Sequence, residues 1–317
     1  MKLGKATREA YGLAVTELGR EDPRIVVLDA DLSKSTMTKY FAQEFPDRFF
    51  NIGIAEANMV GIAAGLAASG KIPFCSSFAC FLMCKGFDQL RVAVAYSSNN
   101  VKVVASHAGI SIGEDGVTQM SVEDIALGMA LPGFVVMAPA DEVETREAVR
   151  AAAAHQGPVY IRVGRMKVPI VYEQGCDFQI GRANLLREGI DVSLIANGLL
   201  VAEALRAAEI LSQEGLQARV LDMHTVKPLD EEALKAAARE TSALVVAEEH
   251  LLNGGLGSAV AQVVARLHPV PIEFVGIADT YAESGPPEQL LQKYGLTADH
   301  IVVAAQRVVE RRMIGAT

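Results

Sequence analysis

The stretch NIGIAEANMVGIAAGLAASG, residues 51–70, is the most informative part of this chain. It contains one acidic residue, Glu56, in a run otherwise built of Gly, Ala, Ile, Leu, Met, Val and small polar residues. This pattern is typical of a helix that is hydrophobic on nearly all sides, so we expect the helix to be buried. A carboxylate at the start of a buried helix needs a partner or a role in proton transfer. Taken alone, the stretch leaves two interpretations of Glu56 open: a first-turn acid stabilised by the helix dipole, or a functional acid.

The composition indicates a protein with a large core and an acidic surface. The chain has 317 residues, half of them hydrophobic, and a formal net charge of −9. This length fits about two domains, and the acidic balance argues against a nucleic-acid-binding surface. The apolar run 57–68 is too short to span a bilayer, and the N-terminus MKLGKATREAYG lacks the apolar centre of a secretory signal. We therefore expect a cytoplasmic protein without a membrane or nucleic-acid partner.

The cysteines give no sign of a metal site or a disulfide framework. The chain has four of them: Cys75, Cys80, Cys84 and Cys176. They form no Cys-x-x-Cys pair, and no histidine lies close enough in sequence to complete a zinc-type ligand set. We expect reduced, buried thiols and no metal site in this chain.

Two blocks of alternating strand and helix patterns organise the chain. In the first block we expect helices at the Glu56 segment, 81–96 and 141–155, and strands over 24–29, 49–54, 71–76, 101–106, 134–138 and 159–163. In the second we expect strands over 191–196, 218–222, 243–248 and 272–275, and helices over 201–214, 230–239, 257–268 and 297–311. Residues 165–190 break the rhythm, so the predicted division is a domain at 1–168, a linker at 169–190 and a domain at 191–317. The alternation predicts parallel sheets covered by helices on both faces.

Polar and aromatic residues follow the predicted strands of the first block. They are Asp31, Ser35, Glu56, Phe78, Phe81, His107, Glu114, Asp115, Gln119, Arg162 and Arg165. Because the carboxyl ends of parallel strands meet at one edge of a sheet, such a set could hold an anionic substrate beside a flat cofactor. Each piece alone is ambiguous: the aromatics also fit a core, a lone histidine is more often structural, and IGEDG (112–116) also fits an ordinary turn. The glycines of GGLG (254–257) fit either an anion site at a helix start or close helix–sheet packing.

The combination of segments resembles a known enzyme family. Four segments are similar to the pyrimidine-binding domain of transketolases: GIAEANMVGIAAGLAASG (53–70), SSFACF (76–81), HAGISIGEDGVTQMSVEDIALGMALPGFVVMAPAD (107–141) and PVYIRVGR (158–165). Two more are similar to their C-terminal domain: LDMHTVKPLD (221–230) and VVAEEHLLNGGLGSAV (245–260). The resemblance covers essentially the whole chain, in order. It implies two consecutive three-layer α/β domains, a thiamine-diphosphate-binding fold of the pyrimidine type followed by a transketolase C-terminal-like domain.

The resemblance also implies a cofactor and roles for particular residues. Transketolases use thiamine diphosphate, whose thiazolium C2 must lose a proton to become a nucleophile. The implied role of Glu56 is a hydrogen bond to N1′ of the aminopyrimidine, which favours the imino tautomer that takes this proton. His107 is implied as a second catalytic residue. The other implied contacts are with the cofactor for Phe78, Phe81 and Asp31, and with the sugar or its phosphate for Ser35, His107, Asp115, Gln119 and Arg165.

Two positions depart from the family's pattern. Gln119 stands where many full-length transketolases carry a second active-site histidine. Gly4 precedes Lys5, where they carry a phosphate-binding arginine before a Lys-Ala-Ser/Thr segment. We therefore expect an intact ketol-transfer core with an altered sugar pocket. A pentose phosphate is the expected substrate, and a less common ketose phosphate stays open.

The family's diphosphate-binding domain is not found in this sequence. That domain binds the diphosphate and a divalent metal through a Gly-Asp-Gly motif followed by an asparagine, and no Gly-Asp-Gly occurs here. We therefore expect the C-terminal subunit of a split transketolase. Its partner would be an N-terminal subunit that carries the metal, Mg or Ca, in an α₂β₂ heterotetramer.

Three other readings remain at this point. The β subunit of a 2-oxoacid dehydrogenase E1 has similar size and the same glutamate, although the HAG turn and the IGEDG segment favour the transketolase. A 1-deoxyxylulose-5-phosphate synthase-like half is a weaker option. A non-catalytic scaffold is disfavoured because it would have no reason to keep a carboxylate in an apolar helix start.

Overall fold

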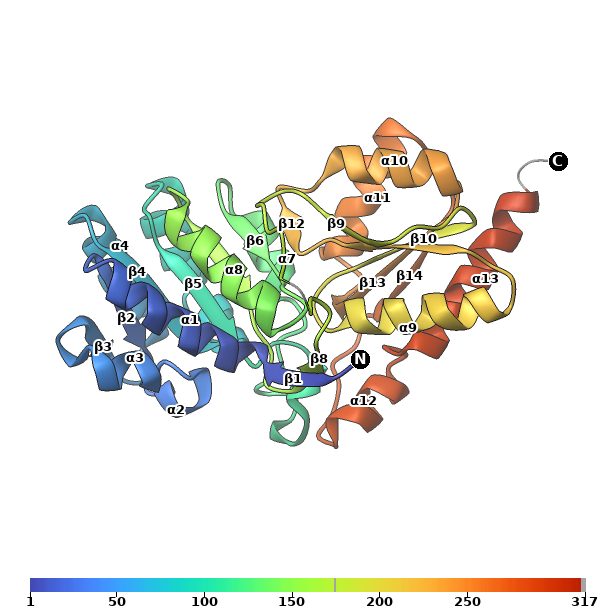
Figure 1. Ribbon diagram of the computed structural model, residues 1–317. Helices are drawn as coiled ribbons and strands as arrows, with labels where there is room; N and C mark the ends of the chain where they lie inside the picture. Colours follow the sequence, from blue (N-terminus) through green and yellow to red (C-terminus); the bar gives the residue numbers. More distant parts are fainter. Residues whose placement is uncertain (174, 315–317) are drawn as a thin grey trace.

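The computed structural model describes residues 1–173 and 175–314 and consists of two α/β halves lying side by side (Figure 1). The elements of the first half are β1 (Leu3–Ala6), α1 (Thr7–Glu21), β2 (Ile25–Asp29), α2 (Ser33–Thr36), α3 (Lys39–Glu44), η1 (Pro46–Arg48), β3 (Phe49–Asn51), α4 (Glu56–Ala68), β4 (Ile72–Phe78), α5 (Ala79–Lys85), α6 (Phe87–Gln89), η2 (Leu90–Tyr96), β5 (Lys102–Ser106), η3 (Ile110–Asp115), α7 (Asp124–Ala130), β6 (Val135–Met137), α8 (Glu142–Ala154), β7 (Val159–Arg162) and β8 (Lys167–Pro169). The elements of the second half are β9 (Asn184–Arg187), β10 (Val192–Ala196), α9 (Leu200–Gln213), β11 (Ala218–Asp222), β12 (Thr225–Lys227), α10 (Glu231–Thr241), β13 (Leu244–Leu251), α11 (Leu256–Leu267), β14 (Ile272–Ile277), α12 (Pro287–Lys293) and α13 (Ala298–Ile314).

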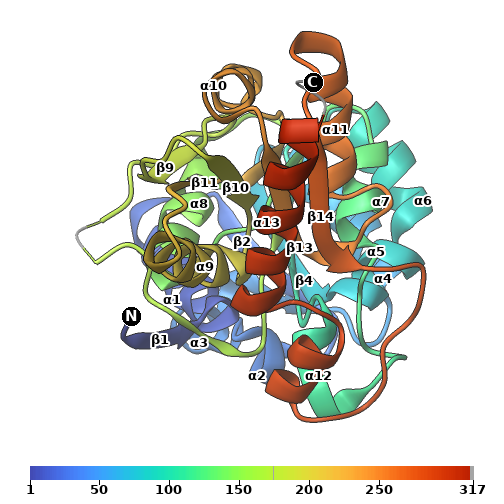
Figure 2. The same cartoon turned by 90° about the vertical axis from the view of Figure 1, so that its right-hand side faces the viewer.

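The first half is built on a seven-stranded sheet in the order β12-β6-β7-β5-β4-β2-β3. Its strands are parallel except β12, which comes from the second half and pairs antiparallel with β6. β2, β4 and β5 are buried along their whole length, as expected for apolar strands covered on both faces. Helices α1 and α8 cover one face, and α4 and α5 cover the other (Figure 2).

The second half is a five-stranded sheet in the order β14-β13-β10-β11-β9. Its strands are parallel apart from β9, which pairs antiparallel with β11. Helices α9 and α13 pack on one face, and α10 and α11 on the other. The structure therefore shows the predicted pair of α/β units with parallel-sheet cores.

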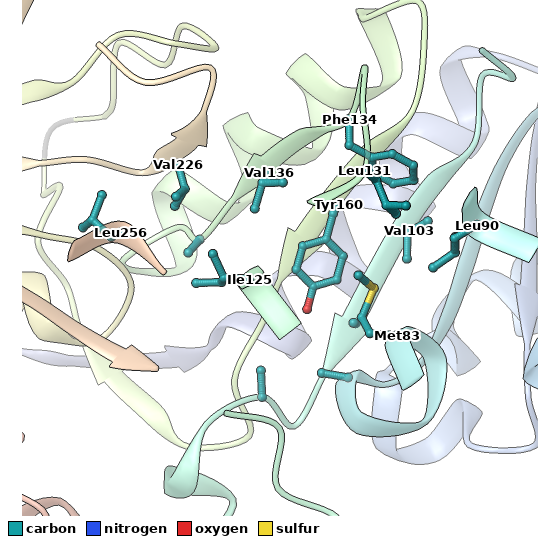
Figure 3. Packing of buried hydrophobic residues seen from close by; sticks show 14 of the residues in the cluster. Met83, Leu90, Val103, Ile125, Leu131, Phe134, Val136, Tyr160, Val226 and Leu256 are labelled. Carbon is teal, nitrogen blue, oxygen red and sulfur yellow. The ribbon is translucent and has the colours of Figure 1, made fainter. Parts of the chain in front are cut away.

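The two halves share their hydrophobic cores. One buried cluster joins Ile125 and Val136 of the first half to Val226 and Leu256 of the second (Figure 3). A second cluster joins Ile112, in the loop after β5, to the core of the second sheet. The relative position of the two sheets is thus fixed by apolar burial and by strand β12, which the second half contributes to the first sheet.

Several predicted elements differ from the structure. The helix expected over 81–96 is broken at Gly86, where a Cβ atom would come within 2.6 Å of the Leu82 carbonyl oxygen. Three short segments, α5, α6 and the π-helical η2, replace it. The segment 165–190, where no element was predicted, contains the short strands β8 and β9, and β8 pairs with β1. The long helix α1 was missing from the predicted elements.

Two expectations about burial are corrected. Helix α4 is buried only on the side that contains Met59, and its other side exposes Asn58, Gly61, Ile62 and Gly65. At Gly61 and Gly65 an added Cβ atom would have no neighbour within 4 Å among the described residues. All four cysteines are free, but only Cys75 is buried and Cys84 is exposed. Within residues 1–173 and 175–314, no helix combines the length and apolar character needed to cross a bilayer.

Candidate active site

The predicted site residues lie at or just beyond the C-terminal ends of the parallel strands of the first sheet. β2 leads to Asp31 and Ser35, β3 to Glu56, β4 to the two phenylalanines, β5 to His107 and its loop, and β7 to Arg165. Parallel pairing of β3, β2, β4, β5 and β7 brings these loops to one edge. This is the edge at which ligands bind in open α/β sheets.

Glu56 is the first residue of α4, and it is 3% exposed. The hydroxyl of Ser77, on β4, donates to Glu56 Oε1 at 3.2 Å. The ammonium of Lys85, at the end of α5, lies 3.6 Å from Oε2, and its side chain is about half exposed. The carboxylate is therefore both near a helix N-terminus and held by two side chains that the sequence analysis did not identify.

Aromatic rings form a stack next to this carboxylate. The Phe78 and Phe81 rings are 5.6 Å apart with an interplanar angle of 14°. Phe78 also stacks on the His107 imidazole, with ring centroids 3.8 Å apart. The Lys85 ammonium lies 4.4 Å from the Phe81 centroid, so the residue that pairs with Glu56 also contacts the stack. Such a stack offers a flat apolar surface for an aromatic ring.

His107 lies in a network of hydrogen bonds at the end of β5. Its backbone has a φ of 59°, which is uncommon for a residue with a Cβ atom. Nδ1 is 2.8 Å from the Ser106 hydroxyl, and Nε2 is 3.0 Å from Arg8 Nη1. Burial, followed by the nearby positive charges of Arg8 and Arg165, lowers the His107 pKa to about 3. His107 is therefore neutral at physiological pH.

Arg8 is a site residue that the sequence analysis missed. It is near the start of α1, and its Nη1 also donates to the carbonyl oxygen of Ser35 at 2.8 Å. Gly4 lies in β1 and packs against Ile170, whereas Arg8 places its guanidinium beside Ser35 and His107. Arg8 directly follows the Lys5-Ala6-Thr7 segment, whereas the arginine expected from the resemblance precedes it.

Arg165 is the second guanidinium of the site. Its Nη1 donates to the carbonyl oxygen of Ile112 and lies 3.2 Å from Glu114 and 4.0 Å from Asp115. It is close enough to Arg8 to help lower the Arg8 pKa, after burial. Gln119 belongs to the same loop, where its backbone N–H donates to the Gly116 carbonyl oxygen and its own carbonyl oxygen accepts a contact from Cys80 Sγ.

Asp31 is separate from these contacts. Its backbone has a φ of 64°, and its carboxylate accepts from the Asn51 amide at 2.9 Å. The loop that contains Asp31 and Ser35 is held by the buried Asp29, whose carboxylate accepts from Thr36 and Thr38. The structure thus joins Ser35 to Arg8 and His107, whereas it places Asp31 on Asn51.

The second half of the chain supports the loop after β5. Glu249, on β13, accepts from the Ser111 N–H at 2.6 Å. Gly109 has a φ of 81°, and a Cβ atom there would lie 2.1 Å from the Glu249 carboxyl carbon. Only a glycine lets the carboxylate approach the backbone so closely. The second half therefore fixes the position of the loop that contains Asp115 and Gln119.

Two other candidate groups turn out to be structural. Arg162 is buried between the halves, where it pairs with Asp124 at 2.9 Å and with Glu249 at 3.7 Å. The helix start at GGLG is occupied by the chain's own Glu248, which accepts from the N–H groups of Leu256 and Gly257. Among the described residues, no group of three or more His, Cys, Asp or Glu side chains is arranged to hold a metal ion.

Comparison with known proteins follows the same division of the chain. Residues 4–171 match the family described as Transketolase, pyrimidine binding domain, and residues 181–301 match Transketolase, C-terminal domain. The 6-deoxy-6-sulfo-D-fructose transketolase subunit SqwH of a Clostridium species is 46% identical over 305 residues, which cover 96% of this chain and 95% of that protein. An apulose-4-phosphate transketolase subunit of Phocaeicola vulgatus is 39% identical over 307 residues, 96% and 98% of the two chains. A solved structure described as "Split gene transketolase, inactive beta4 tetramer" has a TM-score of 0.92 and 50% identity, and covers 98% of this chain and 100% of that one.

Proposed function

The chain belongs to the transketolase family, and we propose that it supplies the pyrimidine side of a thiamine diphosphate site in an enzyme that transfers a two-carbon ketol unit. One observation carries this proposal: the buried carboxylate of Glu56 lies beside the stacked pair Phe78 and Phe81 at the ligand-binding edge of the sheet. A scaffold protein has no use for a carboxylate that is 3% exposed beside a flat apolar surface.

The residues present fit the aminopyrimidine half of the cofactor. The stack of Phe78 and Phe81 offers a face for the ring, and Glu56 offers an acceptor that can share a proton with a ring nitrogen. Bound thiamine diphosphate would supply a nucleophilic carbon for ketol transfer. In this arrangement Ser77 orients the Glu56 carboxylate, and the half-exposed Lys85 can withdraw from it when the ring enters. Asp31 would lie toward the thiazolium side.

The anionic end of the substrate would bind between Arg8 and Arg165. In the part of the chain that the structure describes, Arg8 has no carboxylate within ion-pair distance, and its buried Nε has no hydrogen-bond partner. An unpaired guanidinium beside a second one is a strong site for a phosphate or a sulfonate. Ser35, His107, Asp115 and Gln119 would contact the sugar along the path to the cofactor. The substrates named for the two relatives, a sulfonated ketose and a phosphorylated sugar, both carry such a group.

A partner chain would complete the site. The sequence has no Gly-Asp-Gly motif, so the diphosphate and a divalent metal, Mg or Ca, would be held by an N-terminal subunit. The outer face of α4, with Asn58, Gly61, Ile62 and Gly65, is open and directly follows Glu56. We expect this face to pack against the partner, because its small residues allow close approach of another backbone. A cytoplasmic α₂β₂ heterotetramer is the proposed assembly, and this chain alone is expected to be inactive.

The test is an activity assay of the chain co-expressed with its N-terminal partner. Transfer of a ketol unit from xylulose 5-phosphate or another anionic ketose to an aldose phosphate, lost on separating the chains, supports the proposal. Decarboxylation of pyruvate without ketol transfer would assign the chain to the 2-oxoacid dehydrogenases instead. Condensation of pyruvate with glyceraldehyde 3-phosphate would point to the deoxyxylulose-phosphate synthases, and no turnover with a bound partner would point to a scaffold.

A further inference from the structure

The loop after β5, residues 107–121, packs against the second half of the chain at each of its glycines. Gly109, Gly113 and Gly116 all have a φ of 81°, which a glycine adopts most readily. A Cβ atom added at any of them would lie 2.8 Å or less from an atom of the second half. Glu249 supplies that atom at Gly109, whereas the other two glycines meet a different segment.

Residues 283–287, between β14 and α12, are the segment that meets Gly113 and Gly116. A Cβ atom at Gly113 would lie 2.8 Å from the Pro287 ring, and one at Gly116 would lie 2.3 Å from Ser284 Oγ. Helix α12, which begins at Pro287, packs against η3 (Figure 1). Because the two glycines flank the two acids of the loop in sequence, segment 283–287 supports the backbone that contains both acids.

This segment is anchored at both of its ends. Glu283, at its start, accepts from the Tyr294 hydroxyl at 3.2 Å and pairs with the Lys293 ammonium. Both partners are at the C-terminal end of α12. Leu290, on the same helix, is buried in the core cluster that also contains Ile112 of the loop. Helix α12 thus holds segment 283–287 and the loop together as one packed unit.

The two acids of the loop depend on this backbone for their position. The side chain of Glu114 is 63% exposed and that of Asp115 is 33% exposed. Arg165 Nη1 lies 3.2 Å from the first carboxylate and 4.0 Å from the second. Because burial does not hold these side chains, the backbone supported by segment 283–287 decides where the Asp115 carboxylate lies.

We propose that segment 283–287 is a specificity-determining element, which sets the room for the sugar by fixing the position of Asp115. This inference rests on the proposed function, in which Asp115 contacts the sugar. A displacement of roughly 1 Å at a substrate contact can lower a rate by about 10²-fold. Glu56 lies on α4 and has no contact with this segment, so the second half selects the sugar without altering activation of the cofactor.

Hydrogen exchange of the full-length chain tests the support itself and needs no turnover. Pro287→Ala removes the ring that meets Gly113, and Pro286→Ala makes the same change at the exposed neighbouring residue as a matched control. In Pro287→Ala we expect the amides of residues 110–121 to exchange roughly fivefold faster or more, while those of α4 stay unchanged. Pro286→Ala should match the unmodified chain. Equal exchange over 110–121 in all three proteins would overturn the proposal.

Kinetics of the chain assembled with its partner test the consequence for the sugar. Ser284→Leu enlarges the side chain against Gly116 and should displace the Asp115 backbone. The ratio of kcat/KM for a five-carbon over a six-carbon ketose phosphate should change roughly fivefold or more, mainly through KM. The thiamine diphosphate concentration that gives half-maximal activity should stay the same. Ser284→Ala, which adds no bulk, should keep the sugar ratio of the unmodified enzyme.

A second variant loosens segment 283–287 without adding bulk. Glu283→Ala removes the exposed contacts with Lys293 and Tyr294, so it should also shift the sugar ratio, by a smaller factor. An unchanged ratio in both Glu283→Ala and Ser284→Leu, or an equal rise in the thiamine diphosphate requirement, would contradict the proposal. If the assembled chains transfer no ketol unit, the proposed function fails, while hydrogen exchange still decides whether the segment holds the loop.

Discussion

At the scale of single residues, Glu56 shows that the surroundings of a carboxylate determine whether it is a structural or a functional acid. Its place at the start of α4 is that of an ordinary first-turn acid, which a helix dipole stabilises. Its 3% exposure, the Ser77 hydroxyl and the neighbouring stack of Phe78 and Phe81 turn the same position into a site for proton sharing with a bound ring. The sequence alone left both interpretations open, because neither Ser77 nor Lys85 is near Glu56 in the chain.

Glu56→Gln is expected to remove activity and leave the fold intact. The amide has the same shape and still accepts from Ser77, but it cannot exchange a proton with the cofactor, so kcat should fall roughly 10²- to 10⁴-fold. Only the contact with the half-exposed Lys85 is weakened, which should change the free energy of unfolding by less than about 1 kcal/mol. The checks are kcat of the assembled enzyme at saturating thiamine diphosphate and urea unfolding of the chain. Glu209→Gln, exposed on α9, is the control, and unchanged turnover in Glu56→Gln would remove Glu56 from the mechanism.

Arg8 illustrates what single-residue reasoning cannot reach. Its role depends on the approach of His107, which is 99 positions away in sequence. The sequence analysis identified His107, Ser35 and Arg165 from their places after strands, and the structure brings them together with Arg8. Arg162, the last residue of β7, instead donates to the buried Asp124 at 2.9 Å, a contact that its place in the sequence does not reveal.

At the scale of elements, the parallel strands were the most predictable part of the fold. Strands β2 (IVVLD) and β5 (KVVAS) each contain an uninterrupted apolar run, and burial on both faces favours that pattern. Helix α1 was missed because TREAYGLAVTELGRE mixes small, polar and apolar residues with little periodic contrast. Strand β12 could not be predicted, because a three-residue strand is defined by its partner β6, almost ninety positions earlier.

Gly61→Arg on the outer face of α4 is expected to prevent assembly without unfolding the chain. The Cβ atom has open space in the isolated chain, and replacing a helical glycine generally stabilises a helix by up to about 1 kcal/mol. At an interface of small residues, the same side chain and its charge would keep the partner away. Sedimentation of the mixed subunits and thermal unfolding of the single chain are the two measurements. Glu209→Arg on α9 serves as the control for added charge; a complex of normal affinity with Gly61→Arg would show that the partner binds elsewhere.

The first N–H groups of helix α11 are satisfied by the buried carboxylate of Glu248. Glu248 accepts from the Leu256 N–H at 2.7 Å and from the Gly257 N–H at 2.8 Å, one with each oxygen. In Glu248→Gln one backbone N–H would face an amide NH₂ group, and leaving a buried donor unpaired costs about 1–3 kcal/mol. Urea unfolding should show this loss with an unchanged m-value, relative to Glu209→Gln. Full stability in Glu248→Gln would mean that the helix start is satisfied in another way.

At the scale of the whole molecule, the junction of the two halves contains a pair of buried carboxyl groups. Glu144, on α8, and Asp222, at the end of β11, are both buried and lie close enough that the charge of Asp222 helps to raise the Glu144 pKa. Residues of the segment between the halves surround them: the Tyr172 hydroxyl donates to Asp222 at 2.8 Å, and the Cys176 thiol lies 3.8 Å from Glu144. The charged neighbour is Asp141, whose carboxylate accepts four backbone N–H groups. Among the described residues, no lysine or arginine pairs with either carboxyl.

This pair predicts how the stability of the molecule depends on pH. Burial raises the Glu144 pKa well above its ordinary value and raises the Asp222 pKa to about 7, whereas both are near 4 in an unfolded chain. Between about pH 4 and pH 7 the folded state therefore holds more protons than the unfolded state, so this contribution to stability is present at low pH and is lost as pH rises through 7. Each retained proton makes the free energy of unfolding fall by up to about 1.4 kcal/mol per pH unit across that window.

Glu144→Gln separates this contribution from the rest of the molecule. The amide has nearly the same shape as the carboxyl group but carries no proton that titrates, so the contribution of Glu144 to the pH dependence is removed. The free energy of unfolding, measured by urea from about pH 5 to 8, should decline less steeply in the variant, by up to about one proton's slope. At high pH the variant should be the more stable of the two, because it avoids two adjacent buried charges. Glu147→Gln, on the same helix but outside the junction, should keep the unmodified pH dependence. Parallel curves for Glu144→Gln and the unmodified chain would show that Glu144 does not keep an extra proton in the folded state across this pH range.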